Sequence, residues 1–65
     1  MTVPTPRQLE VIALLADGKK LHEIAEILGI SRYTVGRHVT DAFERTGAAN
    51  SSGLVAMALR NKWIE

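Results

Sequence analysis

A single glycine divides an apolar helical run in the middle of this chain, and it constrains the fold more than any other feature. The run from Glu23 to Val35 reads EIAEILGISRYTV, so Gly29 comes almost two turns into the run and Ser31 follows two residues later. Glycine adopts a positive φ without steric cost, which ends one helix, and serine is a preferred N-cap, which begins the next. The sequence therefore predicts two helices joined by a short turn, the arrangement of a helix-turn-helix.

The flanking sequence adds two further helical segments and shows no alternation typical of a strand. Thr5 and Gln8 stand on either side of Pro6 as in a capping box, and Gly47 ends a later run. Lys20, before the second segment, offers no side-chain acceptor, so we expect a poor N-cap there. We predict one all-α, four-helix domain over residues 1–65, with helices over 6–17, 21–28, 32–46 and 53–61, the last capped by Asn50, Ser51 or Ser52.

Apolar side chains recur at helical spacing and predict the core. The expected buried positions are Leu9, Val11, Ile12, Ala13, Leu15 and Ala16 in the first helix, Ile24, Ala25, Ile27 and Leu28 in the second, and Val35, Val39, Ala42, Phe43 and Thr46 in the third. Glu23 and Glu26 are expected to be solvated charges on the second helix. A core this small leaves a chain of 65 residues near the lower limit for folding alone, so we expect a second subunit to add stability.

Composition argues against several classes of protein. The chain has no cysteine, and its two histidines, His22 and His38, have no further ligands at metal-site spacing, so we expect neither a disulfide nor a metal site. No paired nucleophile or glycine-rich loop forms a catalytic pattern, so we expect no enzymatic activity and no cofactor. The start MTVPTPR does not resemble a signal peptide, and no apolar run approaches the ~20 residues of a membrane span, so we expect a cytoplasmic protein.

The net charge of +1 is too small to identify a nucleic-acid partner, so the positions of the charges decide. Winding the third helix at about 100° per residue places opposite its core side an outer face of Tyr33, Arg37, Thr40, Asp41 and Glu44. The first two turns of that face mix cationic, aromatic and hydroxyl groups, which can donate to guanine, contact a thymine methyl and bind phosphate. This gradient is typical of a helix whose N-terminal half enters the major groove of double-stranded DNA.

We therefore predict two sets of DNA contacts. The base-reading residues are Tyr33, Thr34, Arg37 and Thr40, and the phosphate-binding residues are Lys19, Lys20, His22, Arg32 and Arg45. Simpler interpretations stay open: Arg37 as a solvated charge, Tyr33 as a cover for the core edge, and the lysines as ordinary loop residues. His38 is interpreted as a structural, hydrogen-bonded histidine, and Glu10 is expected to pair with a basic group, for which a residue near the turn is a candidate.

The sequence resembles the DNA-binding domain of LuxR-type (GerE-type) bacterial transcription regulators from Thr5 to Ile64. The resemblance rests on TPRQLEVIALLADG, on EIAEILGIS followed by TVGRH, on Gly47, and on ANSSGLVAMALRNKWI. It implies a cytoplasmic, sequence-specific regulator that reads DNA with its third helix and forms a homodimer on inverted repeats through its fourth. The expected interface residues are Leu54, Val55, Met57, Leu59 and Trp63, and RNA polymerase is a further candidate partner.

Three features depart from the family pattern. Gly36 stands directly after TV, where family members usually carry a basic residue, and it costs the helix about 1 kcal/mol relative to alanine. The segment AANSSG is less bulky and less basic than usual, and the chain carries no receiver or ligand-sensing domain, so we expect no small-molecule ligand. Two alternatives remain open: a sigma-factor region-four-like promoter-binding module, and a protein-binding module that captures another regulator through Leu54, Val55, Met57, Leu59, Trp63 and Ile64.

Overall fold

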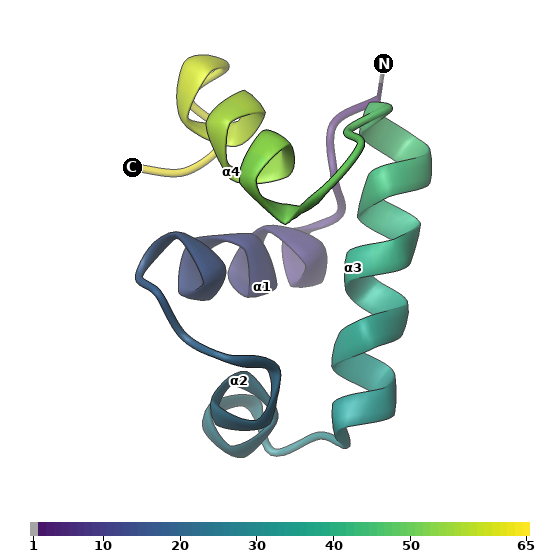
Figure 1. Cartoon of the computed structure of the whole chain (residues 1–65), viewed down its shortest axis with the longest axis vertical. Coiled ribbons are helices and arrows are strands. Elements are labelled where there is room, and N and C mark those ends of the chain that lie inside the picture. Colours follow the sequence, from purple (N-terminus) through teal and green to yellow (C-terminus); the bar gives the residue numbers. More distant parts are fainter. Residues whose placement is uncertain (1) are drawn as a thin grey trace.

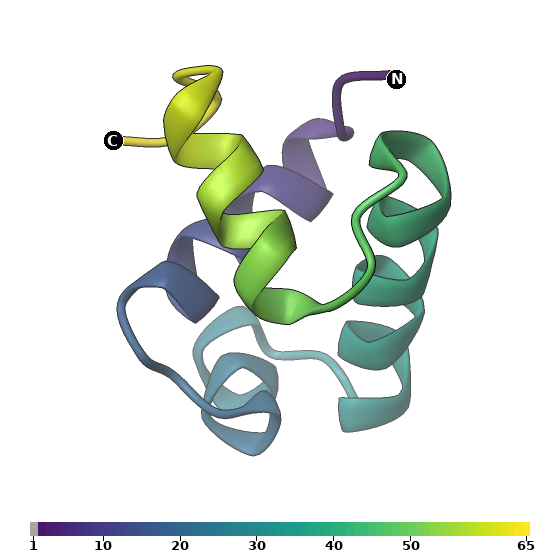
Figure 2. The same ribbon diagram turned by 45° about the horizontal axis from the view of Figure 1, so that its top comes forward.

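The computed structural model describes residues 2–65, which form four helices and no strand, so the predicted all-α fold is confirmed. The helices are α1 (Pro6–Ala16), α2 (Leu21–Leu28), α3 (Arg32–Thr46) and α4 (Ser51–Arg60). Figure 1 shows the long α3 along one side of the molecule, with α2, α1 and α4 stacked beside it from its N-terminal to its C-terminal end. α4 also crosses α1, with which it is in contact (Figure 2). Within residues 2–65 no helix is long and apolar enough to cross a membrane.

The helix-turn-helix has the predicted geometry. Gly29 follows α2 in the left-handed conformation, with φ 68° and ψ 34°, and Ser31 caps α3 by accepting a hydrogen bond from the Thr34 N–H at 3.1 Å. Beyond the glycine, the Ile30 N–H donates to the Ala25 carbonyl oxygen at 3.0 Å. The turn therefore satisfies backbone groups at the end of α2 and at the start of α3.

One helix start differs from the prediction, and a second has an additional capping contact. α4 begins at Ser51, two residues earlier than expected, because the Asn50 side chain caps it and accepts the Gly53 N–H at 2.8 Å. At α2, the Lys20 side chain provides no cap, as expected, but the Glu23 carboxylate accepts the Lys20 N–H at 2.8 Å. The interpretation of Glu23 as a purely solvated charge is therefore wrong, because its carboxylate satisfies one of the free N–H groups at the start of α2.

The core consists of two clusters that share α1 and α3. One cluster lies at the helix-turn-helix and contains the buried side chains of Val11, Ile24, Ala25 and Val35, with Leu14, Leu15, Leu28, Ile30 and Val39 packed against it. The other lies under α4 and contains Ile12, Ala42, Leu54 and Ala58, with Leu9, Phe43, Ala48, Val55, Trp63 and Ile64 packed against it. The neighbours Val11 and Ile12 thus serve different clusters from one helix.

Two predicted core positions are wrong. Ile27 is 55% exposed, because it lies about 100° around α2 from Leu28 and outside the stripe that faces α1 and α3. Ala16 is exposed because it is the last residue of α1, beyond the region that the neighbouring helices cover. The buried position of Thr46 is confirmed, and its hydroxyl is satisfied by donating to the Ala42 carbonyl oxygen at 2.7 Å.

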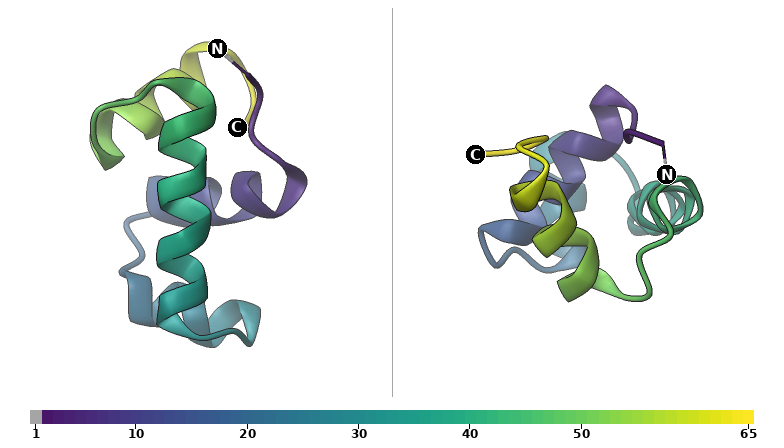
Figure 3. Two further views of the ribbon diagram at one scale, coloured as in Figure 1. Left: turned by 90° about the vertical axis from the view of Figure 1, so that its right-hand side faces the viewer. Right: turned by 90° about the horizontal axis from the view of Figure 1, so that it is seen from above.

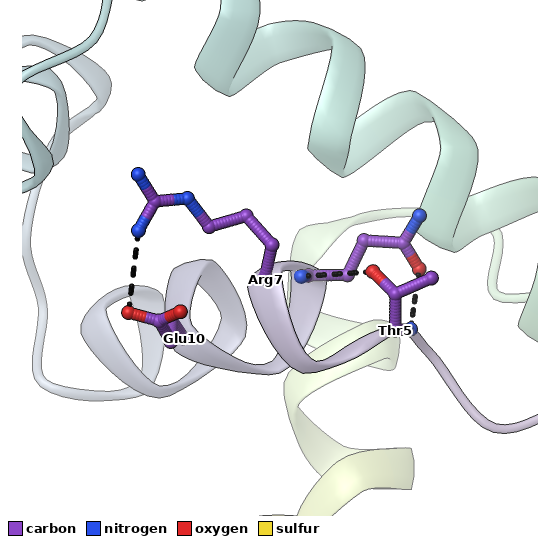
Figure 4. A network of polar contacts seen from close by, with 4 residues as sticks. Thr5, Arg7 and Glu10 are labelled. Carbon is purple, nitrogen blue, oxygen red and sulfur yellow. Dashed lines mark hydrogen bonds and ion pairs between the residues drawn. The ribbon is translucent and has the colours of Figure 1, made fainter.

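Polar contacts hold the amino-terminal segment and the start of α1 in place. The predicted capping box is present: the Gln8 N–H donates to Thr5 Oγ1 at 3.2 Å, and the Thr5 N–H donates to Gln8 Oε1 at 3.0 Å (Figure 4). Glu10 pairs with Arg7 at 3.3 Å on its own helix, so the expectation of a partner near the turn is wrong. An i,i+3 pair on one helix forms without any tertiary rearrangement.

Candidate nucleic-acid interface

The outer side of α3 is uncovered along its length, and Figure 3 (left) shows it in front of the other helices. Tyr33 is 74% exposed, and Arg37, Thr40 and Glu44 are also exposed, whereas Asp41 is half-buried. Because Tyr33, Arg37 and Thr40 recur at spacings of four and three residues, they form one continuous surface, which we call the outer strip. Three of the four predicted base-reading residues therefore lie side by side in the N-terminal two-thirds of α3.

The opposite side of α3 fixes the direction in which the outer strip points. Val35, in the first turns of α3, is fully buried in the cluster that also contains Ile24 and Ala25 of α2. A residue as small as Ala25 lets the two helices approach, and the left-handed Gly29 redirects the chain between them. Local sequence thus sets α3 across α2, and burial of Val35 prevents rotation about its axis.

Thr34, the fourth predicted base-reading residue, has a different environment. Its side chain is half-buried, and its hydroxyl lies 2.9 Å from Ser31 Oγ while its backbone N–H donates to that same oxygen. The Thr34 hydroxyl is therefore shared with the N-cap of α3. Thr34 lies in the first turn of α3, at the end of the helix that is nearest the turn and beside the outer strip.

The predicted phosphate-binding residues fall into three separate places. Arg32 begins α3 beside the outer strip, whereas the exposed Lys19, Lys20 and His22 lie at the start of α2, a helix length of ~12 Å from the turn. Arg45 lies 13 residues after Arg32, about 20 Å along α3. The structure therefore places Arg32 at the N-terminal end of α3, next to Tyr33 in the sequence, and Arg45 near the opposite end of that helix.

Arg45 instead contacts the amino-terminal segment. Its Nε and Nη2 donate to the Val3 carbonyl oxygen at 3.3 and 3.0 Å, and its own carbonyl oxygen accepts the Thr2 N–H at 2.8 Å. Pro4, next along the segment, is buried. These contacts hold residues 2–4 beside the C-terminal end of α3, where the purple segment runs in Figure 1.

Charge is distributed along α3 as the sequence indicates. Arg32 and Arg37 lie in its N-terminal half, and Asp41 and Glu44 lie in its C-terminal half. Among residues 2–65 the ion pair is Arg7–Glu10, so neither the Arg32 nor the Arg37 guanidinium is neutralised by a carboxylate within the described chain. His38 is half-buried and makes no hydrogen bond to another residue within that same part of the chain, which contradicts its interpretation as a hydrogen-bonded structural histidine.

The predicted interface on α4 needs one correction. Leu54 is fully buried against Ile12, Ala42 and Ala58, so its side chain supports the core of its own subunit and cannot contact a partner. Val55, Met57 and Trp63 are half-buried, and Leu59 is 49% exposed. The surface that α4 offers is a groove beside the end of α1, lined by Leu15, Ala16, Ser51, Ser52, Val55, Ala56 and Leu59.

Leu15, Ala16, Ser51, Ser52 and Ala56 line this groove, and none of them is predicted from the sequence as an interface residue. Their contribution depends on how α4 crosses α1, which no local pattern in either helix specifies (Figure 2). The position of Ala16 at the end of the apolar stripe of α1 is one sequence feature that could have indicated its exposure, because an apolar residue at the end of such a stripe can belong to the surface and not to the core.

Comparison with known proteins agrees with this architecture. Residues 3–58 match the family model described as bacterial regulatory proteins, luxR family. The chain is 43% identical over 60 residues to the transcriptional activator protein BjaR1 of Bradyrhizobium diazoefficiens, covering 92% of this chain and 25% of that protein. It is 42% identical over 55 residues to the quorum sensing-dependent transcriptional regulator RpaR of Rhodopseudomonas palustris, covering 85% and 23%.

A third relative is the quorum sensing-dependent transcriptional regulator VjbR of Brucella abortus, 40% identical over 55 residues, covering 85% of this chain and 21% of that protein. The chain thus spans about a quarter of the length of the curated relatives that it matches. The family match extends over both core clusters, from the amino-terminal segment to Ala58 in α4. This protein belongs to the LuxR family of bacterial transcription regulators and comprises the helix-turn-helix domain of that family.

Proposed function

We propose that this chain binds double-stranded DNA sequence-specifically, with the N-terminal half of α3 in the major groove, and thereby regulates transcription in the cytoplasm. The observation that carries the proposal is the outer strip: Tyr33, Arg37 and Thr40 are exposed on one side of a helix whose other side is locked into the core. The relatives are named as transcription regulators, which agrees with such a role.

Each member of the outer strip has a chemistry suited to base edges. The Arg37 guanidinium, which no carboxylate within residues 2–65 neutralises, can donate two parallel hydrogen bonds to a guanine. Tyr33 and Thr40 each combine an apolar surface with a hydroxyl, so they can contact a thymine methyl and a polar base edge. Thr34, whose hydroxyl is shared with Ser31, contributes through its remaining hydrogen-bonding capacity.

Phosphate contacts are divided between the ends of α2. Lys19, Lys20 and His22 are exposed at the start of α2, where the Glu23 carboxylate already accepts the Lys20 N–H, so their side chains and not the helix end would bind phosphate; Arg32 lies at the start of α3. Arg45 is the weakest candidate for a phosphate contact, because its guanidinium contacts Val3 and the residue lies about 20 Å along α3 from Arg32. These contacts fix the orientation of the protein on the duplex without reading its sequence.

Dimerisation completes the proposed function. The α1–α4 groove exposes Leu59 and Ala16 and part of Val55, and two copies that met there would each present an outer strip to one half-site. Half-sites would then lie about one helical turn of DNA apart. RNA polymerase is a candidate partner of the complex on promoter DNA.

The test is selection of bound sequences from a random pool of duplex DNA, followed by titration of the selected duplex and a scrambled one. We expect a palindromic consensus and a clear preference for it. A second function, capture of another protein, is favoured by the exposed Leu59 and Ile27 and by the small net charge. Failure of the parent protein to bind any duplex would support that second function. The family match argues against a sigma-factor-like module.

A further inference from the structure

Gly36 is a glycine that the fold itself does not require. The chain has five glycines, all within residues 2–65, and Gly18, Gly29 and Gly47 have φ values of 82°, 68° and 80°, which few other residues adopt. At Gly53 a Cβ would lie 3.4 Å from Asn50 Oδ1. A Cβ at Gly36 would meet nothing within 4 Å, and the φ of Gly36 is not positive.

This glycine weakens the helix that carries the proposed function. Gly36 lies inside α3, where glycine destabilises a helix by about 1 kcal/mol relative to alanine. Neither backbone conformation nor packing within residues 2–65 accounts for the missing side chain, so we ask what it leaves room for outside the chain. The position of Gly36 on α3 indicates which partner could use that space.

Gly36 lies at the edge of the outer strip. Tyr33 precedes it by three residues and Thr40 follows it by four, so both are its neighbours on the helix surface. Its backbone N–H and C=O are paired inside α3, so the surface that it offers is the apolar Cα. Gly36 is half-buried, and DNA that contacts Tyr33 and Thr40 would pass beside this Cα.

We propose, on the basis of the proposed function, that Gly36 is a specificity-determining residue whose missing side chain admits the C5-methyl group of a thymine. That methyl is the apolar group that base pairs display in the major groove. The Gly36 Cα, the Tyr33 ring and the Thr40 methyl group provide apolar surface around it. The protein therefore prefers T·A at this position because any Cβ at residue 36 would occupy the volume of the methyl group.

The experiment pairs a side chain added to the protein with a methyl group removed from the DNA. Deoxyuridine replaces each thymine of the selected site in turn, and Kd is measured for the parent protein and for Gly36→Ala. At one thymine the parent is expected to lose about fourfold in affinity, the value of one buried methyl group. Gly36→Ala is expected to bind the thymine site about fivefold or more weakly than the parent, as for a mismatched base pair, and to recover on deoxyuridine at that same position.

Gly53→Ala is the matched control, because it also replaces a glycine inside a helix but lies on α4, away from the outer strip. We expect thermal melts to show both variants folded and Gly53→Ala to bind the selected site like the parent. Equal affinity of Gly36→Ala and parent for the thymine site would overturn the inference and leave the proposed function intact. A loss that no single deoxyuridine repairs would also overturn it. Absence of binding by the parent would overturn the proposed function itself.

Discussion

The Ile30 N–H donates a hydrogen bond to the Ala25 carbonyl oxygen at 3.0 Å, across the left-handed Gly29. The Gly29 N–H donates to the Glu26 carbonyl oxygen at 3.3 Å inside the same turn, which completes a Schellman motif. Ile30 then packs on the cluster of Val11, Ile24 and Val35. One turn therefore both ends α2 and contributes to the core that orients α3.

The two glycines of this region should respond oppositely to the same change. Gly29→Ala is expected to lower the free energy of unfolding by about 1 kcal/mol, because alanine is strained at φ 68°, whereas Gly36→Ala is expected to raise it by about 1 kcal/mol. Thermal or urea denaturation of both variants measures the difference. Equal stability of Gly29→Ala and the parent would contradict the geometry of the turn.

Base reading and phosphate binding should have different signatures. Arg37→Ala is expected to cost about 1 to 3 kcal/mol on the selected duplex, much less on a scrambled duplex, and to relax preference at one base pair. Lys20→Ala is expected to weaken both duplexes alike and to reduce the salt slope by about one unit. Titrations at several salt concentrations separate the two. Equal losses on both duplexes for Arg37→Ala would make it a phosphate contact.

Arg45→Ala provides a comparison with Lys20→Ala, since each removes one positive charge. Because the Arg45 guanidinium contacts the Val3 carbonyl oxygen at the far end of α3, the salt slope of DNA binding is expected to stay within half a unit of the parent value. Lys20→Ala should change the salt slope of DNA binding at least twice as much as Arg45→Ala does. If both variants reduce it equally, Arg45 reaches a phosphate and the amino-terminal segment must move on binding.

Substitutions of two leucines of α4 should distinguish an effect on self-association from an effect on folding stability. Leu59→Asp places a charge on the exposed rim of the α1–α4 groove, so it is expected to abolish self-association with little change in the melting temperature of the monomer. Leu54→Ala removes a fully buried side chain and is expected to cost about 2 to 5 kcal/mol of stability. Sedimentation equilibrium and urea denaturation measure the two effects. A Leu59→Asp protein that still dimerises would exclude this groove as the interface.

The helical order and the turn could be predicted because local signals specify them. A left-handed glycine, a serine cap and a capping box act within four residues, so their sequence pattern is sufficient. The start of α4 was less certain because Asn50, Ser51 and Ser52 can all cap a helix. In the structure the Asn50 oxygen accepts the Gly53 N–H, and the helix begins two residues earlier than predicted.

The exposed positions are harder to predict from sequence, because the exposure of a side chain depends on which neighbouring helix packs over it. The periodicity of α2 does not say how wide its covered stripe is, so Ile27 was placed in the core although it is 55% exposed. The apolar positions of α4 could be assigned to core or interface only once its crossing of α1 was known, which is why Leu54 was misplaced. Arg45 likewise gave no sequence signal for its contact with Val3, 42 residues away.

Val11 and Ile12 are adjacent in α1 yet belong to different core clusters. One cluster holds α2 and the other holds α4, while α1 and α3 supply side chains to both. Fraying of α4 can therefore expose Ile12 and leave the packing of Val11 against Ile24 in place. In amide hydrogen exchange, α2 and α4 would then open as independent units, and the amides of α1 around Val11 and Ile12 would exchange only when the whole chain unfolds.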